Sequence, residues 1–305
     1  MDLSAKLFLP LLGLCLFPKV SFGEDLIFLR NLPAHMFSEG SSESELEPIE
    51  TDRHDFTQSP RTVGAGVVQV EGGYSYFYND ENDETESSHT TPELVTRIGL
   101  TEDLELRVRW NYAWQFRNGE EELNDLDSAE DIRYGLKLAL TEHNGWIPES
   151  AVRIIGSSHT GGSDFTTNHA QFGMDLVYEW KNEADWSLAG STGFGTDGVG
   201  EFSLASFAGQ SLTDAEGEDG GRDRFTAIAQ SVALGMPITE RMELYLEYFG
   251  IFSHGLQNEF NLNFFDTGVD YLLSPDLVID VRVGAGLNEQ ADDFFVGVGG
   301  AYRFR

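Results

Sequence analysis

The chain has 305 residues, and its 52 acidic and 19 basic residues give a formal net charge of −33. A surface this acidic repels phosphate, so no nucleic-acid partner is expected. The single cysteine, Cys15, lies in the N-terminal segment described next, which excludes a disulfide framework or thiol-ligated metal elsewhere.

Residues 1–23 are predicted to form a secretory signal peptide. Lys6 supplies a positive charge, an apolar stretch of eleven residues runs from Leu7 to Phe17, and small Ser21 and Gly23 provide a cleavage site. The apolar stretch is too short for a spanning helix. A buried helix of a cytosolic domain is the less favoured alternative.

Residues 24–60 form a polar segment rich in Ser and Glu. We expect this segment to be mostly irregular, and either to lie on the periplasmic side or to fold into a lumen as a plug. Strand-like alternation follows, so residues 61–305 are predicted to be an outer-membrane β-barrel.

The strongest barrel signal is the run 104–116, in which every second residue is apolar. Side chains alternate between the two faces of a strand, so one face of this run is apolar and aromatic while the other is polar and charged. The run exceeds the usual five or six residues of a soluble strand and is long enough to cross a bilayer. The sequence therefore predicts an all-β fold, a transmembrane antiparallel up-and-down barrel.

Similar patterns predict about twelve strands, at 66–78, 92–100, 104–116, 131–140, 150–158, 170–180, 186–195, 225–236, 242–252, 260–272, 277–287 and 294–304. Short turns are expected at 101–103, 141–149, 181–185, 237–241 and 274–276. Longer, mostly acidic loops are expected near 79–91, 117–130, 159–169, 196–224, 253–259 and 288–293. This alternation is typical of bacterial barrels and places both termini in the periplasm. Four residues break the apolar phase and suggest bulges or lumen-facing aromatics: Tyr245, Phe249, Ile251 and Phe265.

Aromatic residues fall where a barrel meets the lipid headgroups. One group lies beside the short turns (Trp146, Trp180 and Trp186), and the other lies near the longer loops (Tyr78, Trp114, Phe194, Phe225, Phe252 and Phe294). The final strand alternates up to Tyr302 and Phe304 before Arg305. It is similar to the segments by which barrels are recognised, so the barrel assembly machinery is an expected partner.

The run Thr51-Asp-Arg-His-Asp-Phe-Thr-Gln-Ser-Pro60 and the strand Val67–Tyr74 resemble the opening of a known family. This is the family of outer-membrane transporters named for the MetA (meta-cleavage) pathway of phenol degradation. Residues 92–101 and 103–107 resemble its next two strands, although His54 stands where the family usually has proline. The resemblance covers 51–305 and implies a barrel for uptake of small organic compounds.

The polar face of the predicted strands carries most basic residues of the chain. The lumen-lining and solute-binding candidates are Glu71, Glu93, Arg97, Glu105, Arg107, Arg109, Arg133, Lys137, Arg153, Arg282 and Arg303. Acids at Asp175, Glu179, Glu243, Glu247, Asp270 and Asp280 share this face. Buried charges are costly unless paired or hydrated. These residues therefore either form an arginine-lined path for anions or a ladder of ion pairs that fills the barrel, and for a single arginine the ladder is favoured.

We expect a channel in the cell outer membrane for passive or gated passage of small organic solutes, with aromatic or anionic cargo, and with membrane lipid as surroundings. No cofactor or metal is expected. A lipase-like or protease-like barrel is an alternative, but the histidines (His35, His54, His89, His143, His159, His169 and His254) lack the His-x-Ser spacing of outer-membrane phospholipases. A structural barrel or a secreted β-sandwich without transport activity would also fit the alternating pattern.

Overall fold

The computed structural model describes residues 48–53, 56–81, 84–118, 125–163, 165–166, 170–196, 225–255 and 259–305. The predicted signal peptide, residues 24–47, His54 and most of the predicted loop 196–224 lie outside these ranges. Among the described residues, no helix has the length and apolarity needed to cross a membrane.

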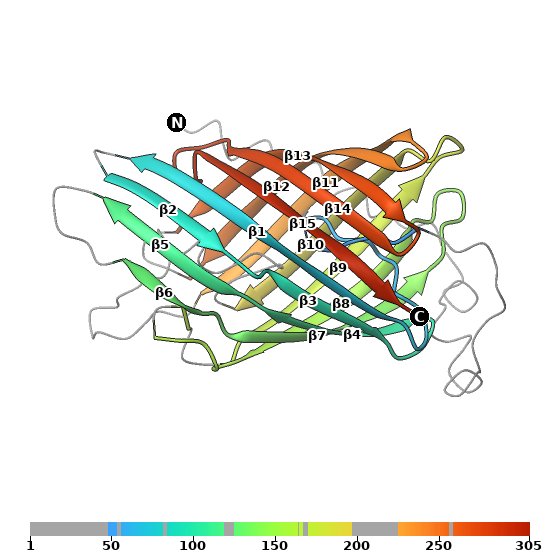
Figure 1. The fold of residues 1–305 in the computed structure, drawn as a ribbon, viewed down its shortest axis with the longest axis horizontal. Coiled ribbons are helices and arrows are strands. Elements are labelled where there is room, and N and C mark those ends of the chain that lie inside the picture. Colours follow the sequence, from blue (N-terminus) through green and yellow to red (C-terminus); the bar gives the residue numbers. More distant parts are fainter. Residues whose placement is uncertain are drawn as a thin grey trace.

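The described chain forms a single closed antiparallel β-barrel of twelve strands, seen from the side in Figure 1. The last strand pairs with the first, from Val68↔Phe304 to Tyr78↔Phe294, which closes the sheet. The strand segments are β1 (Val68–Glu81), β2 (Glu84–Thr90), β3 (Leu94–Gly99), β4 (Leu104–Trp110), β5 (Tyr112–Asn118), β6 (Leu126–Ala129), β7 (Ile132–Thr141), β8 (Glu149–Ser158), β9 (Phe172–Lys181), β10 (Ser187–Thr196), β11 (Thr226–Thr239), β12 (Met242–His254), β13 (Asn261–Ser274), β14 (Leu277–Gly286) and β15 (Phe294–Phe304).

Three barrel strands are each built from two segments, which explains fifteen labels for twelve strands. The pairs are β2 with β3, β4 with β5, and β6 with β7. The loop predicted at 79–91 is wrong, because β1 continues to Glu81 and β2 begins at Glu84. Polar residues on both faces of this hairpin hide the alternation. The predicted loop 117–130 likewise contains β6.

The two faces of the barrel are inverted relative to a water-soluble protein. On β14, Ile279, Val281 and Val283 point outward, and Val281 is 54% exposed, while Asp280 and Arg282 are buried. The same pattern holds around the ring, so an apolar belt faces outward and a polar face lines the interior. This arrangement is stable where hydrocarbon surrounds the protein.

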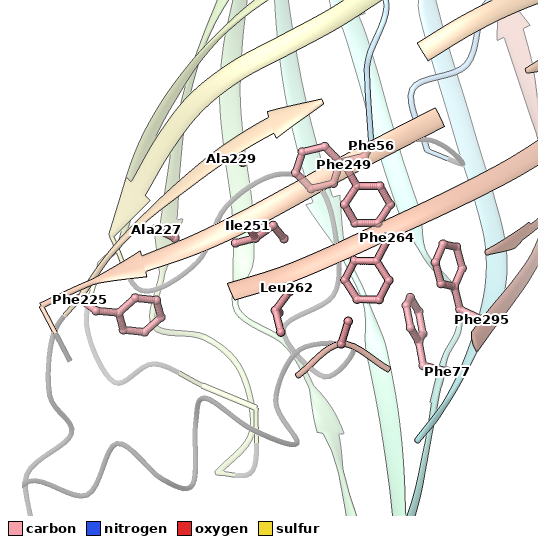
Figure 2. Packing of buried hydrophobic residues seen from close by; sticks show 11 residues of the cluster. Phe56, Phe77, Phe225, Ala227, Ala229, Phe249, Ile251, Leu262, Phe264 and Phe295 are labelled. Carbon is pink, nitrogen blue, oxygen red and sulfur yellow. The ribbon is translucent and has the colours of Figure 1, made fainter. Parts of the chain in front are cut away.

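One region of the interior, here called the apolar half because it lies on the half of the ring formed by β11 to β15, is rich in apolar side chains. Close to the long-loop ends of β11 to β15, Phe249, Phe264 and Phe295 point inward with Ile251 and Leu262, as Figure 2 shows. The predicted phase break on β12 is confirmed as lumen-facing Tyr245, Phe249 and Ile251, and the β12–β13 register has no bulge. The interpretation of Phe265 was wrong, because Phe265 faces outward in phase and its neighbour Phe264 points inward.

The predicted aromatic girdle is present at the short-turn end, where Trp146 is 95% exposed and Trp186 also faces outward. The indole N–H of Trp180 donates to the carbonyl of Trp146 at 3.1 Å. At the long-loop end, Phe194 and Phe294 are exposed, but Phe225 is buried in the interior apolar cluster and does not belong to the girdle.

Candidate functional site in the lumen

The described residues of segment 48–61 (48–53 and 56–61), here called the strap, lie inside the ring and contact strands on different sides of it, among them β1, β7, β12 and β14. Both ends of the strap are held at the short-turn end of the barrel. The amide of Ile49 donates to the carbonyl of Pro275 at 2.9 Å, and Arg61 pairs with Glu50 at 2.5 Å and with Glu149 at 3.1 Å. The strap therefore rises into the lumen and returns to the same rim.

Asp52 of the strap lies among three cations of the wall. Its carboxylate is 2.6 Å from the Nζ of Lys137 and 3.3 Å from the guanidinium of Arg97, and it also accepts from Arg107. The side chains of Asp52 and Lys137 are fully buried. Short contacts with several donors make this the most strongly held carboxylate of the strap.

The charges around the strap determine how its carboxyl groups titrate. Burial alone would raise the pKa of Asp52, but Arg97, Lys137 and Arg107 hold that pKa well below its ordinary value. Burial also opposes ionisation of Glu50, yet Lys181 and Arg61 lower the pKa of Glu50 to about 2. Asp52 and Glu50 are therefore both ionised at neutral pH.

Arg53 points away from Asp52 and reaches a different part of the wall. Its guanidinium donates to Glu93 on the β2–β3 strand at 2.7 Å and pairs with Asp280 on β14. Two glycines make room for it, because a Cβ on Gly73 would lie 2.6 Å from the guanidinium carbon, and a Cβ on Gly299 would also clash. The two adjacent strap residues thus anchor the strap to two separate parts of the ring.

Phe56 lies at the tip of the strap and enters the apolar half of the lumen. Its ring stacks on Phe249 with centroids 4.6 Å apart and planes 4° apart, and Phe249 stacks in turn on Phe264 at 4.9 Å. The backbone amides of Phe56 and Thr57 both donate to the buried carboxylate of Glu247, at 2.8 and 2.5 Å. Packing and hydrogen bonds together fix the tip.

Beside Phe56, a small cavity lies against β7 to β11. Arg153 borders it and is held by Asp175 through two hydrogen bonds of 2.7 and 2.6 Å, and it also donates to Gln58 of the strap. Small residues Ser191 and Gly193 form the facing wall. Within the described residues, this cavity is bordered by both a charged side chain, Arg153, and an aromatic ring, Phe56.

Charge is unevenly distributed around the interior. The basic side is formed by β3, β4, β7 and β8 and carries Arg97, Arg107, Arg109, Arg133, Lys137 and Arg153. Across the ring, the inward faces of β12 to β14 carry the acids Glu247, Asp266, Asp270 and Asp280. One base, Arg282, lies on the same face of β14 as Asp280. Two facing walls of opposite charge create a field across the lumen that orients a charged solute.

The structure places ten of the eleven sequence-predicted lumen residues in buried positions: Glu71, Glu93, Arg97, Glu105, Arg107, Arg109, Arg133, Lys137, Arg153 and Arg282. Arg303 lies instead at the short-turn rim, where it pairs with Asp276 at 3.0 Å. The pairing of Arg97 with Glu105 at 2.9 Å and of Arg153 with Asp175 fits the ion-pair ladder.

Sequence reasoning did not single out the strap residues that contact these side chains, namely Asp52, Arg53, Phe56, Thr57 and Gln58. One signal could have found them. The strap is a short polar stretch that carries an adjacent acid and base, and the wall carries both signs at intervals of two. Buried charges on the wall are costly unless they are paired, and a segment with matching charges that enters the lumen supplies those partners.

Comparison with known proteins places this fold in a family. Residues 51–304 match the profile of the family described as "Putative MetA-pathway of phenol degradation". The match begins at Thr51, so it includes most of the strap. No curated protein matches the chain.

Solved structures similar to this one are outer-membrane barrels. The COG4313 outer membrane channel from Pseudomonas putida F1 superposes with a TM-score of 0.60 at 11% identity, over 84% of this chain and all of that one. The translocator domain of the autotransporter NalP from Neisseria meningitidis gives a TM-score of 0.49 at 12% identity, over 79% and 89% of the two chains. At 11% identity, the match to the COG4313 channel supports the barrel fold.

Proposed function

Because the chain belongs to the family described as "Putative MetA-pathway of phenol degradation", we propose that it is an outer-membrane channel for small organic solutes. Passage follows a concentration gradient and is gated by the strap. The outward apolar belt and the charged interior support this proposal, because they suit a barrel with lipid outside and polar solutes inside. The similar COG4313 barrel is itself described as a channel.

The observation that carries the gating is the position of the strap. Residues 49–53 and 56–61 lie in the lumen, most of them buried, and are anchored to separate parts of the ring from the short-turn rim up to the apolar cluster at Phe249. Short turns lie on the periplasmic side in bacterial barrels, so the strap closes the channel from the periplasm. A solute can pass through the lumen only after the strap has moved.

Planar-bilayer recording tests the proposal with two deletions. Removing residues 24–60 takes away nearly all of the strap and should raise the single-channel conductance. The matched control removes residues 24–47 only, keeps the strap, and should conduct like the parent. Both variants should retain the heat-modifiable gel migration of a folded barrel.

Two results would count against the proposal. If none of the three proteins conducts ions or passes solutes in liposome swelling, the protein is not a channel. If the two deletions conduct equally, the strap is not its gate. The solutes of first choice for swelling are aromatic and anionic ones, since the lumen offers stacked phenylalanines and arginines.

A barrel hydrolase is the second candidate function, because a histidine, a hydroxyl and a carboxylate lie in contact at one place in the structure. In the β8–β9 loop, the Nδ1 of His159 contacts the hydroxyl of Thr166 at 2.7 Å, and that hydroxyl donates to Asp131 at 2.9 Å. In a catalytic triad the acid orients the histidine rather than the nucleophile. We therefore propose no hydrolytic role, and assays of lipid and peptide hydrolysis by the purified protein check this directly.

A further inference from the structure

The ammonium group of Lys137 is held entirely by the strap within the described structure. It donates to the carboxylate of Asp52 at 2.6 Å, to the carbonyl of Ser59 at 2.8 Å and to the carbonyl of Arg61 at 3.1 Å. All three acceptors leave when the strap leaves. A lysine buried on the barrel wall then has no hydrogen-bond acceptor, and its remaining neighbouring carboxylate, its cross-strand partner Glu105, is already shared with Arg97 and Arg107, which is a costly state.

The other two cations around Asp52 keep partners on the wall. Arg97 donates to both carboxylate oxygens of Glu105 at 2.9 Å and contacts Glu71 at 3.4 Å. Arg107 is 3.2 Å from the same Glu105. These contacts connect wall residues only, so they do not depend on the strap.

Counting charges in this cluster gives one cation too many once the strap has left. With the strap in place, three cations (Arg97, Arg107 and Lys137) face three carboxylates (Asp52, Glu71 and Glu105). Without Asp52, three cations face two carboxylates. The wall is therefore built to receive one further carboxylate at Lys137, and Asp52 supplies it in the closed state.

We propose that the pocket formed by Lys137, Arg97 and Arg107 is a binding site for organic monocarboxylates, and that a bound monocarboxylate replaces Asp52 and releases the strap. This inference rests on the proposed function, in which the strap closes the channel. The solute that is to be transported thus competes with the internal carboxylate that keeps the channel shut.

The rest of the strap fits this competition. Arg53 pairs with the carboxylates of Glu93 and Asp280, which repel an anion once Arg53 has left. An incoming carboxylate is therefore directed to the Lys137 side. Release of the strap also withdraws Phe56 from Phe249, which exposes an aromatic face beside the path. Aromatic acids gain from both groups, and a monocarboxylate without a ring gains only from the first.

Strap release can be measured without any conductance recording. The side chain of Thr57 is buried against Ser231, and the full-length protein with a Thr57→Cys substitution carries one thiol after removal of the predicted signal. The rate at which a polar maleimide labels this thiol reports how often the strap opens. The probes are benzoate and benzamide, which have nearly the same shape and differ in charge, at constant ionic strength.

Benzoate should accelerate labelling at about ten-fold lower concentration than benzamide, because a hydrogen bond to a charged group contributes at least one factor of ten in affinity. A Lys181→Met substitution is the matched control, since Lys181 also contacts the strap, at Glu50 and 3.3 Å, but lies outside the pocket. The preference for benzoate should survive in this variant. It should be absent when Asp52→Asn and Lys137→Met are combined, which removes one charge of each sign.

Equal effects of benzoate and benzamide on the parent protein overturn the inference. So does a benzoate preference that persists in the folded double variant. If the double variant loses its heat-modifiable migration, the comparison of the two probes on the parent protein decides alone. Labelling does not require conduction, so failure of the carboxylate site and failure of the channel proposal are separate results.

Discussion

Lys137 on β7 and Asp52 on the strap form a fully buried ion pair at 2.6 Å, although 85 positions separate them in the sequence. This pair connects the wall of the barrel to the segment that fills its lumen. The strength of the pair therefore sets how firmly the strap stays in place, and several measurable properties depend on it.

An Asp52→Asn substitution should destabilise the closed protein strongly. It keeps the shape of the side chain but removes the carboxylate to which the buried ammonium of Lys137 donates, and breaking such a pair costs about 3–5 kcal/mol. The free energy of unfolding in urea, measured in lipid vesicles, checks this value. Combining the substitution with Lys137→Met should recover part of the loss, and an equal or larger loss in the combined variant would contradict the pairing.

Acid should release the strap. The pKa of Asp52 is well below its ordinary value in the folded protein, and the pKa of Glu50 falls from 4.5 to about 2. A carboxyl with a lowered folded pKa contributes stability that is complete above its unfolded pKa and is lost as the pH falls toward the folded one. Conductance should therefore rise as the pH falls from about 4.5 to about 2.

The matched control for the acid response is Glu50→Gln, which removes the carboxyl group whose pKa is lowered to about 2. The variant should show a weaker conductance rise in the same pH range, because it lacks one of the two strap carboxyl groups whose pKa is lowered in the folded protein. A parent channel whose conductance is unchanged down to pH 2 would be inconsistent with ion pairs holding the strap.

A Phe56→Ala substitution should loosen the tip of the strap. It removes a ring stacked on Phe249 and leaves a void in the apolar half of the lumen, a change that costs about 3–5 kcal/mol for a buried phenylalanine. Maleimide labelling of the Thr57→Cys thiol should accelerate. A Phe56→Leu substitution keeps most of the burial and should give a smaller acceleration; the opposite order would show that stacking and filling do not hold the tip.

A Gly73→Ala substitution should displace Arg53, whereas Gly72→Ala should not. A Cβ on Gly73 would lie 2.6 Å from the guanidinium of Arg53 and 2.6 Å from the carbonyl of Val298, while a Cβ on Gly72 meets nothing within 4 Å. The two variants differ by one position on the same strand and so share any general effect of alanine on β1. Faster labelling at position 57 in the first variant only is the expected result.

The barrel could be predicted from the sequence because one physical rule governs most of it. Lipid outside and polar groups inside force a period of two, and β4, β9 and β14 keep this period along their whole length. The rule failed at the β1–β2 hairpin, where the strands extend past the lipid belt and both faces are polar. It also failed at Phe264 and Phe265, where consecutive aromatics leave the phase undetermined.

The candidate site could be predicted only in part, since the wall follows the period and the strap does not. Arg97, Lys137 and Arg153 were identified because they alternate with apolar neighbours on strands. Asp52 and Phe56 lie on an irregular segment, and their partners are set by tertiary contacts that no local pattern encodes. The resemblance to the family marked the right stretch, but it did not indicate which side chains enter the lumen.

The most direct test of strap gating is a reversible disulfide between the strap and the wall. The hydroxyl oxygens of Thr57 and Ser231 are 2.5 Å apart, close to the distance of about 2.0 Å between the sulfurs of a disulfide. The chain has no other cysteine once the predicted signal peptide, which contains Cys15, is removed. The control pair is Ser191 and Ser231, 2.7 Å apart, which joins two wall strands and leaves the strap unbound.

Single-channel conductance of the two double-cysteine proteins should be recorded before and after addition of a reductant. The Thr57→Cys/Ser231→Cys channel should be silent when oxidised and should open on reduction, whereas the Ser191→Cys/Ser231→Cys channel should conduct equally in both states. A strap-locked protein that conducts as well oxidised as reduced would contradict the claim that this segment must move for solutes to pass.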